Sequence, residues 1–168
     1  MAPSRAYPIA LPSAVRVAAL YPGAFLADAY AIELPSSASL NTLALARSAL
    51  ERQAPWVERL MKLRDAIVSM FGLKTASALR ADAGAGRTPR IGIFRIYETL
   101  HDEVVLGEDD KHLDFRLSIQ RSAGQLRAVT VVHCHNRLGR SYIRLIAPFH
   151  RMVVKSALNR AARAGWPV

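Results

Sequence analysis

The feature that most constrains the fold is an alternation of apolar and polar side chains over residues 111–121. Every second position is apolar, and these positions are Leu113, Phe115, Leu117 and Ile119. A period of two residues is typical of a β-strand with one buried face. A turn over 122–125 follows, and residues 126–135 are predicted to return as the antiparallel partner strand. The chain is therefore expected to build an antiparallel sheet around this hairpin.

The remaining segments supply further strands and helices. Strands are predicted at 27–34, 90–100 and 102–106, helices at 40–52, 55–72 and 140–164, and a loop at 74–89. Pro148 should kink the last helix or break it into two parts, because proline removes a backbone donor. This order of elements predicts an α+β domain, with two helices between the first strand and the rest of the sheet.

Length and composition predict one domain. A single compact domain over 25–168 is expected for a chain of 168 residues, after an extended, proline-rich lead-in over 1–24. The only cysteine, Cys134, excludes a disulfide framework and a multi-cysteine metal site. No apolar run reaches the ~18–20 residues of a membrane-spanning helix, and no secretory signal is recognisable. A cytoplasmic protein is therefore expected.

The chain carries a strong positive charge. It has 23 Lys and Arg against 13 Asp and Glu, a formal net charge of +10, which favours contact with polyanions. Only the last helix organises its cations, with Arg140, Arg144, Arg151 and Lys155 on the side opposite its apolar face. No nucleic-acid motif or interleaved aromatic residues accompany them, so specific nucleic-acid binding is not expected.

Three separated blocks occur in an order found in a known family. They are WVERLMKLRD at 56–65, GEDDKHLDFR at 107–116, and NRLGRSY at 136–142 followed by PFH at 148–150. Together they resemble the DUF2867 family of uncharacterised bacterial proteins, over roughly residues 25–160. The resemblance implies a helix-grip fold like that of START, Bet v 1 and polyketide-cyclase proteins, in which a curved antiparallel sheet wraps on a long C-terminal helix. A similar module is fused behind oxidoreductase domains, which implies a non-catalytic partner module as one function.

A helix-grip fold leaves a cavity between sheet and helix, where a small apolar or amphipathic ligand can bind. The candidate ligand-binding residues are Trp56, Phe94, Phe115, His133, Tyr142, Ile146 and Phe149. The alternative is that such side chains form an ordinary packed core. If Arg127 faces outward, Thr130 faces the cavity. If Val129 and Val131 face inward instead, His133 enters it, and the sequence leaves both alternatives open.

Polar residues in the same region are compatible with two kinds of chemistry. Acid–base catalysis of the dehydratase or cyclase type would use His133, Asp114 or Tyr142. His133 and His135 share one face of the predicted strand at about 6.5–7 Å, and His112 could join them as a third metal ligand. The alternative is that these histidines bond to backbone or solvent. Among these functions, ligand binding is preferred. No cofactor is predicted, and the sequence does not decide whether the chain forms a homo-oligomer.

Three further polar features are predicted to be structural. Residues 108–110 are predicted to form a solvated acidic turn between strands. His150, at the edge of the apolar side of the last helix, is predicted to be a hydrogen-bonded boundary residue rather than a catalyst. Cys134 is expected to be a buried thiol.

Overall fold

The computed structural model describes residues 4–51, 54–69 and 89–168, so the end of the helix predicted at 55–72 and nearly all of the loop predicted at 74–89 lie outside the described residues. One antiparallel sheet contains seven strands in the order β1-β2-β7-β6-β5-β4-β3. The strands are β1 (Tyr7–Pro8), β2 (Leu26–Glu33), β3 (Arg90–Ile91), β4 (Phe94–Thr99), β5 (Glu103–Asp109), β6 (Leu113–Ser122) and β7 (Gln125–Cys134). The helices are the 3-10 helix η1 (Arg16–Leu20), α1 (Thr42–Leu50), α2 (Pro55–Ser69) and α4 (Arg137–Ala164).

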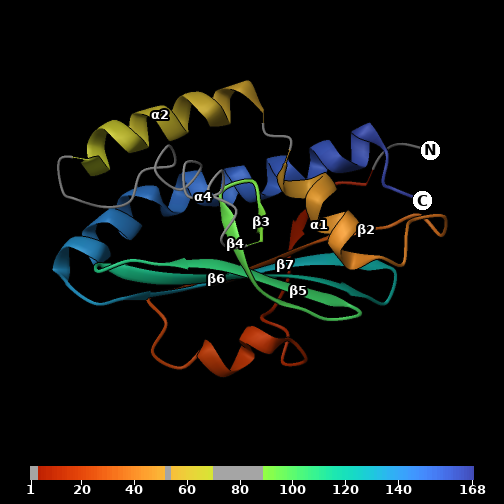
Figure 1. The fold of residues 1–168 in the computed structure, drawn as a ribbon, viewed down its shortest axis with the longest axis horizontal. Helices are drawn as coiled ribbons and strands as arrows, with labels where there is room; N and C mark the ends of the chain where they lie inside the picture. Colours follow the sequence, from red (N-terminus) through yellow and green to blue (C-terminus); the bar gives the residue numbers. More distant parts are fainter. Residues whose placement is uncertain (1–3, 52–53, 70–88) are drawn as a thin grey trace.

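Helices cover the sheet on one side and the N-terminal segment covers it on the other. Figure 1 shows α1, α2 and α4 above the sheet and η1 below it. The long C-terminal helix contacts β2 and β7, and α1 contacts β5 and β6. This is the predicted α+β arrangement, a curved antiparallel sheet that holds a long C-terminal helix in the manner of a helix-grip fold.

The predicted alternation of β6 is confirmed, and it builds the main core on the helix side. Leu117 and Ile119 of β6 pack in one cluster with Leu106 of β5. Leu45 of α1 and Leu158 of α4 complete this cluster from above, and both side chains are almost fully buried. Burial of such side chains supplies most of the stabilisation of a domain of this size.

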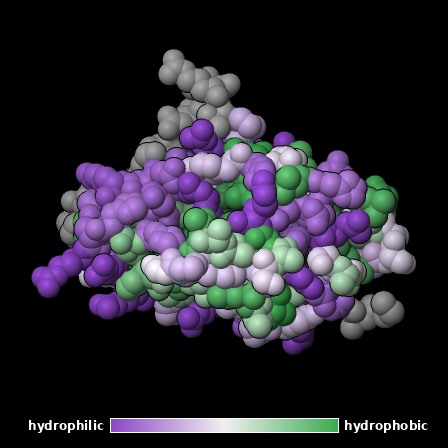
Figure 2. Space-filling view, turned by 90° about the horizontal axis from the view of Figure 1, so that it is seen from below, coloured by the Kyte–Doolittle hydropathy of each residue, from purple (hydrophilic) through white to green (hydrophobic). Residues whose placement is uncertain are grey.

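The opposite face of the sheet is also buried, which settles the facing of β7. Val129 and Val131 pack there against Val15 and Val17 of the N-terminal segment. Gln120 donates from the same face to the carbonyl oxygen of Ala14 at 2.6 Å. The other residues of β7, Ala128, Thr130 and Val132, therefore face the helices. Figure 2 shows the molecule from the η1 side, with hydrophilic residues gathered toward one end of this face.

The last helix begins three residues before its predicted start and does not break. The side chain of Asn136 caps it by accepting the backbone N–H of Gly139 at 2.9 Å. The helix then continues through Pro148 to Ala164 as one element. Of the two predicted alternatives, the break is therefore wrong, because the packing of a long apolar face against the sheet holds the helix together on both sides of the proline, and the kink stays a prediction.

Two details of the strand predictions are also corrected. The segment 90–100 is not one strand but two, because the chain turns at Gly92, whose φ of 60° is in the left-handed region. Residues 108–110 are not a turn throughout, since Glu108 and Asp109 belong to β5 and pair with β6. Glu108 consequently faces the helices, and Asp109 faces the other side of the sheet.

Candidate functional site

A cavity of about 480 Å³ lies between the sheet and the helices α1, α2 and α4. Its wall is almost entirely apolar. The sheet contributes Leu113, Phe115, Leu117, Ile119, Ala128 and Val132, and the helices contribute Ala49, Val57, Leu60, Ile143, Ile146 and Val153, among others. Phe94 and Phe115 meet edge to face in this wall, with their ring centroids 5.8 Å apart. A space of this volume and character suits a small apolar molecule.

Five of the seven predicted ligand-binding residues line this cavity. They are Phe94, Phe115, Tyr142, Ile146 and Phe149. The other two do not line it: Trp56 lies on α2 with an exposed side chain, and His133 lies on the opposite face of the sheet. Leu145 and Phe149 of α4 also line the cavity although they are 57% and 43% exposed, so they mark where it opens to the surface.

A buried ion pair adds a polar group to one part of the wall. Glu108 of β5 lines the cavity, and its Oε2 lies 2.9 Å from Nη1 of Arg90 on β3. The same Nη1 donates to the carbonyl oxygen of Ile93 at 2.7 Å. Both charged side chains are largely buried, so the pair keeps the short β3–β4 turn against the cavity wall.

A second polar group joins β2, β7 and α4. His150 lines the cavity, and its Nε2 lies 3.2 Å from Oδ1 of Asp28 on β2. Asp28 is directly opposite Thr130 in the pairing of β2 with β7, and Thr130 also lines the cavity. These three residues are separated by up to 122 positions in the chain, and only the pairing of β2 with β7 under α4 brings them together.

The cationic side of α4 lies along β2 rather than wholly in solvent. The guanidinium of Arg144 lies over the ring of Phe25, 5.5 Å from its centroid. The Nε atom of Arg151 is 4.0 Å from Oδ2 of Asp28. About one helical turn further along α4, Nζ of Lys155 is 5.5 Å from the centroid of the Tyr30 ring. The predicted row of cations therefore also fixes the helix against the strand, through ring contacts and one ion pair.

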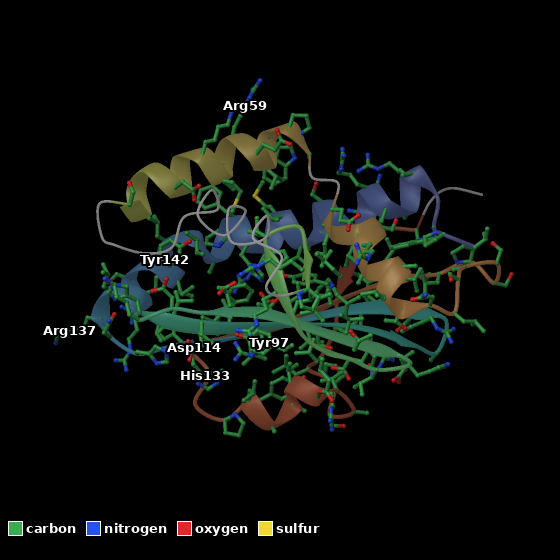
Figure 3. All side chains as sticks on the ribbon, in the orientation of Figure 1. Arg59, Tyr97, Asp114, His133, Arg137 and Tyr142 are labelled. Atoms are coloured by element: carbon green, nitrogen blue, oxygen red, sulfur yellow. The ribbon has the colours of Figure 1, made fainter. Side chains whose placement is uncertain are left out.

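The three predicted catalytic side chains are not brought together. Tyr142 lines the cavity on the helix side of the sheet, whereas Asp114 and His133 pair across β6 and β7 and point to the other side (Figure 3). Nε2 of His133 lies 2.8 Å from the carbonyl oxygen of Leu20, so this imidazole holds the N-terminal segment. The geometry therefore offers no shared acid–base site for these residues.

The predicted metal ligands also have separate partners. Nε2 of His135 lies 2.9 Å from Oδ2 of Asp114, and Nδ1 of His112 lies 2.8 Å from the side-chain amide of Asn136. Within residues 4–51, 54–69 and 89–168, no three His, Cys, Asp or Glu side chains are grouped closely enough to hold a metal ion. The half-buried thiol of Cys134 has a raised pKa because of its burial, which disfavours the reactive thiolate.

Comparison with known proteins places this arrangement in a family. Residues 20–157, which include every cavity-forming strand and most of α4, match DUF2867, described as a protein of unknown function. The chain belongs to the DUF2867 family. No curated protein and no solved structure gave a significant match to it. In the described part of this DUF2867 chain, no helix is long and apolar enough to cross a membrane.

The sequence of this DUF2867 chain did not predict the polar group formed by Asp28, Thr130 and His150. His150 was predicted to be a hydrogen-bonded boundary residue, and its bond to Asp28 agrees with that prediction. Asp28 carried no signal, because its partners come from segments that are distant in the sequence. A charged residue inside the mostly apolar strand β2 is the feature that could have indicated a specific partner.

Proposed function

We propose that the protein binds a small, mostly apolar molecule in the cavity between the sheet and α4. The observation that carries this proposal is the cavity itself, about 480 Å³ with a wall of aliphatic and aromatic side chains. Pockets of about 300–1,000 Å³ with apolar walls and few polar groups are the usual sites for small ligands. Structurally, a domain that needed only a packed core would fill this space, since protein interiors are close-packed.

The opening of the cavity supports the same proposal. Leu145 and Phe149 keep large parts of their side chains in contact with solvent, although exposed apolar groups of this size gain nothing for the isolated domain. Their place beside the opening suits the passage of an apolar molecule. We further propose that the chain shares this mode of binding with START-like helix-grip proteins and works in the cytoplasm, which its single unpaired cysteine favours.

The first experiment asks whether the cavity is occupied or can be filled. Organic extracts of the purified protein are analysed by mass spectrometry, and the protein is titrated with N-phenyl-1-naphthylamine, a neutral probe that fluoresces in apolar surroundings. We expect saturable binding of this probe. The variant Ala157→Phe puts a ring into the cavity wall and should abolish the binding, whereas Ala164→Phe, at an exposed position near the end of α4, should not.

The outcome is decided by comparing these two variants. If the probe does not bind to the wild type, or binds equally well to Ala157→Phe and to the wild type, the proposed function is wrong. Circular dichroism spectra of both variants check that the fold is intact. The same spectra show whether a loss of binding follows from the filled cavity or from unfolding.

A further inference from the structure

The wall of the cavity contains a hydroxyl group that has no partner. The side chain of Thr130 is 5% exposed and lines the cavity, and its Oγ1 makes no hydrogen bond with any residue that the structure describes. Buried polar atoms are nearly always paired, so an unpaired hydroxyl in an apolar wall needs an explanation. A ligand group that donates to this oxygen or accepts from it would supply the missing bond.

A second hydrogen-bonding atom lies on the same part of the wall. The carboxylate of Asp28 can only accept, so Nε2 of His150 carries the proton in their 3.2 Å contact. This contact fixes the orientation of the imidazole and leaves Nδ1 as the ring atom that can meet a ligand. Among the described residues, the only side-chain hydrogen bond of His150 is this contact of Nε2 with Asp28.

The pairing of β2 with β7 places these atoms close together. Thr130 and Asp28 are directly opposite each other, and side chains in such a pair have Cβ atoms about 4.5–5.5 Å apart. The side chain of His150 extends from α4 to Asp28, so it lies over the same part of the sheet. The rest of the surrounding wall is apolar, with Ala128 and Val132 on either side of Thr130.

We infer that Thr130 and His150 form the hydrogen-bonding end of the cavity and that they bind a neutral hydroxyl group on an otherwise apolar molecule. The inference rests on the proposed function and names its ligand class, an apolar alcohol or phenol. A hydroxyl can donate to Nδ1 of His150 and accept from Thr130, whereas an ether or a ketone can only accept. A carboxylate ligand is disfavoured because it would lie beside the carboxylate of Asp28, whose charge Arg151 offsets only from an exposed position.

The experiment compares two isomers that differ only in the hydroxyl group. The probe N-phenyl-1-naphthylamine is displaced from the protein by 1-decanol and, separately, by methyl nonyl ether, which has the same atoms but no donor. We expect the wild type to bind the alcohol about tenfold more tightly, the effect of one well-formed hydrogen bond in an apolar site. Decanoate at neutral pH is expected to bind less tightly than 1-decanol.

Variants of similar size identify the side chains that cause the preference for the alcohol over the ether. His150→Leu removes the acceptor of the ligand's proton, and it should reduce the preference for the alcohol to within about twofold without changing the affinity for the ether. Thr130→Val keeps the shape of the side chain and its suitability for a strand. Because the alcohol and the ether both accept from Thr130, this variant should weaken the binding of both by about tenfold and keep the preference. Ser156→Ala removes another hydroxyl that lines the cavity, and it serves as the matched control that keeps the preference.

The two proposals fail in different ways. If the probe binds but the wild type does not distinguish 1-decanol from the ether, if His150→Leu keeps the full preference, or if Thr130→Val binds both as tightly as the wild type, the inference is wrong while the proposed function is unaffected. If the Ser156→Ala control loses the preference to the same extent, the hydroxyl is bound elsewhere and the inference is also wrong. If the probe does not bind at all, both are wrong.

Discussion

The carboxylate of Glu103 accepts the backbone N–H of Arg16 through both of its oxygens, at 2.9 and 3.1 Å. Glu103 is only 3% exposed, and it also accepts the hydroxyl of Ser118 at 2.6 Å. A buried carboxylate is tolerated when such donors surround it. This one group therefore joins the N-terminal segment to two neighbouring strands on the lower face of the sheet.

Replacing this carboxylate should weaken the fold. Glu103→Ala leaves a backbone N–H and a hydroxyl without their acceptor, and we expect the free energy of unfolding to fall by about 2–3 kcal/mol in urea denaturation. The matched control is Glu98→Ala, which removes the exposed ion pair between Glu98 and Arg16 and should cost much less, because solvent screens an exposed pair. Equal losses in the two variants would contradict the assignment.

The start of α4 depends on a close contact at Gly139. A Cβ atom there would overlap the carbonyl oxygen of His112 in the turn before β6. Gly139→Ala should therefore destabilise the protein by about 1–3 kcal/mol, although alanine is the better helix former by about 1 kcal/mol. Ser141→Ala, at an exposed position in the same turn, should be neutral or slightly stabilising. Thermal unfolding followed by circular dichroism measures both, and a stabilised Gly139→Ala would rule out the steric contact.

The buried ion pair at the cavity wall should be sensitive to the loss of one partner. Arg90→Met removes the 2.9 Å contact between Arg90 and Glu108, and the loss of a hydrogen bond between charged, largely buried groups costs about 1.5–3 kcal/mol. Arg47→Met, which breaks the exposed pair with Glu51 on α1, should cost about 0.3–0.5 kcal/mol. Chemical denaturation of the two variants gives the comparison. A cost for Arg90→Met as small as that for Arg47→Met would show that the pair is not shielded from water.

Asp109 should make stability depend on pH. Its partial burial raises the pKa of the carboxyl, but hydrogen bonds from Arg116 at 2.6 Å and Tyr97 at 2.9 Å outweigh this effect and hold the pKa below its ordinary value of 3.8. A depressed pKa stabilises the folded state above the pKa of the unfolded chain, and this contribution is lost as the pH falls through the lower folded value. The wild type should be more stable than Asp109→Asn at about pH 6, and this difference should shrink below about pH 4. A difference that does not change with pH would contradict this account.

The strands were predictable where polar and apolar residues are separated between the two faces, and ambiguous where both faces carry apolar residues. The alternation of β6 identified its inner face because its polar residues are clearly separated from its apolar ones. In β7 the same argument was undecided, since the N-terminal segment buries Val129 and Val131 while the helices cover Thr130 and Val132. A strand that is buried on both faces loses the pattern on which such a prediction depends.

The candidate site was harder to predict than the fold. Periodicity selected most of the aromatic residues that line the cavity, because those side chains are needed for any core on the helix side. It could not show that the space between them is open, which depends on the distance between layers. Periodicity also could not predict the contact between Asp28 and His150, because this contact joins residues near opposite ends of the chain.

The pairing of β2 with β7 has a consequence for how the protein is made. Because Leu26–Glu33 pairs along its whole length with Gln125–Cys134 and on its other side only with the short β1, the first long strand has an unsatisfied edge until most of the chain has left the ribosome. The hairpin of β6 and β7 can form early from local contacts, and β2 and α4 must then be added from the two ends. The cavity would therefore be the last part to take shape, and a ligand present at that moment would stabilise the newly completed fold by binding to it.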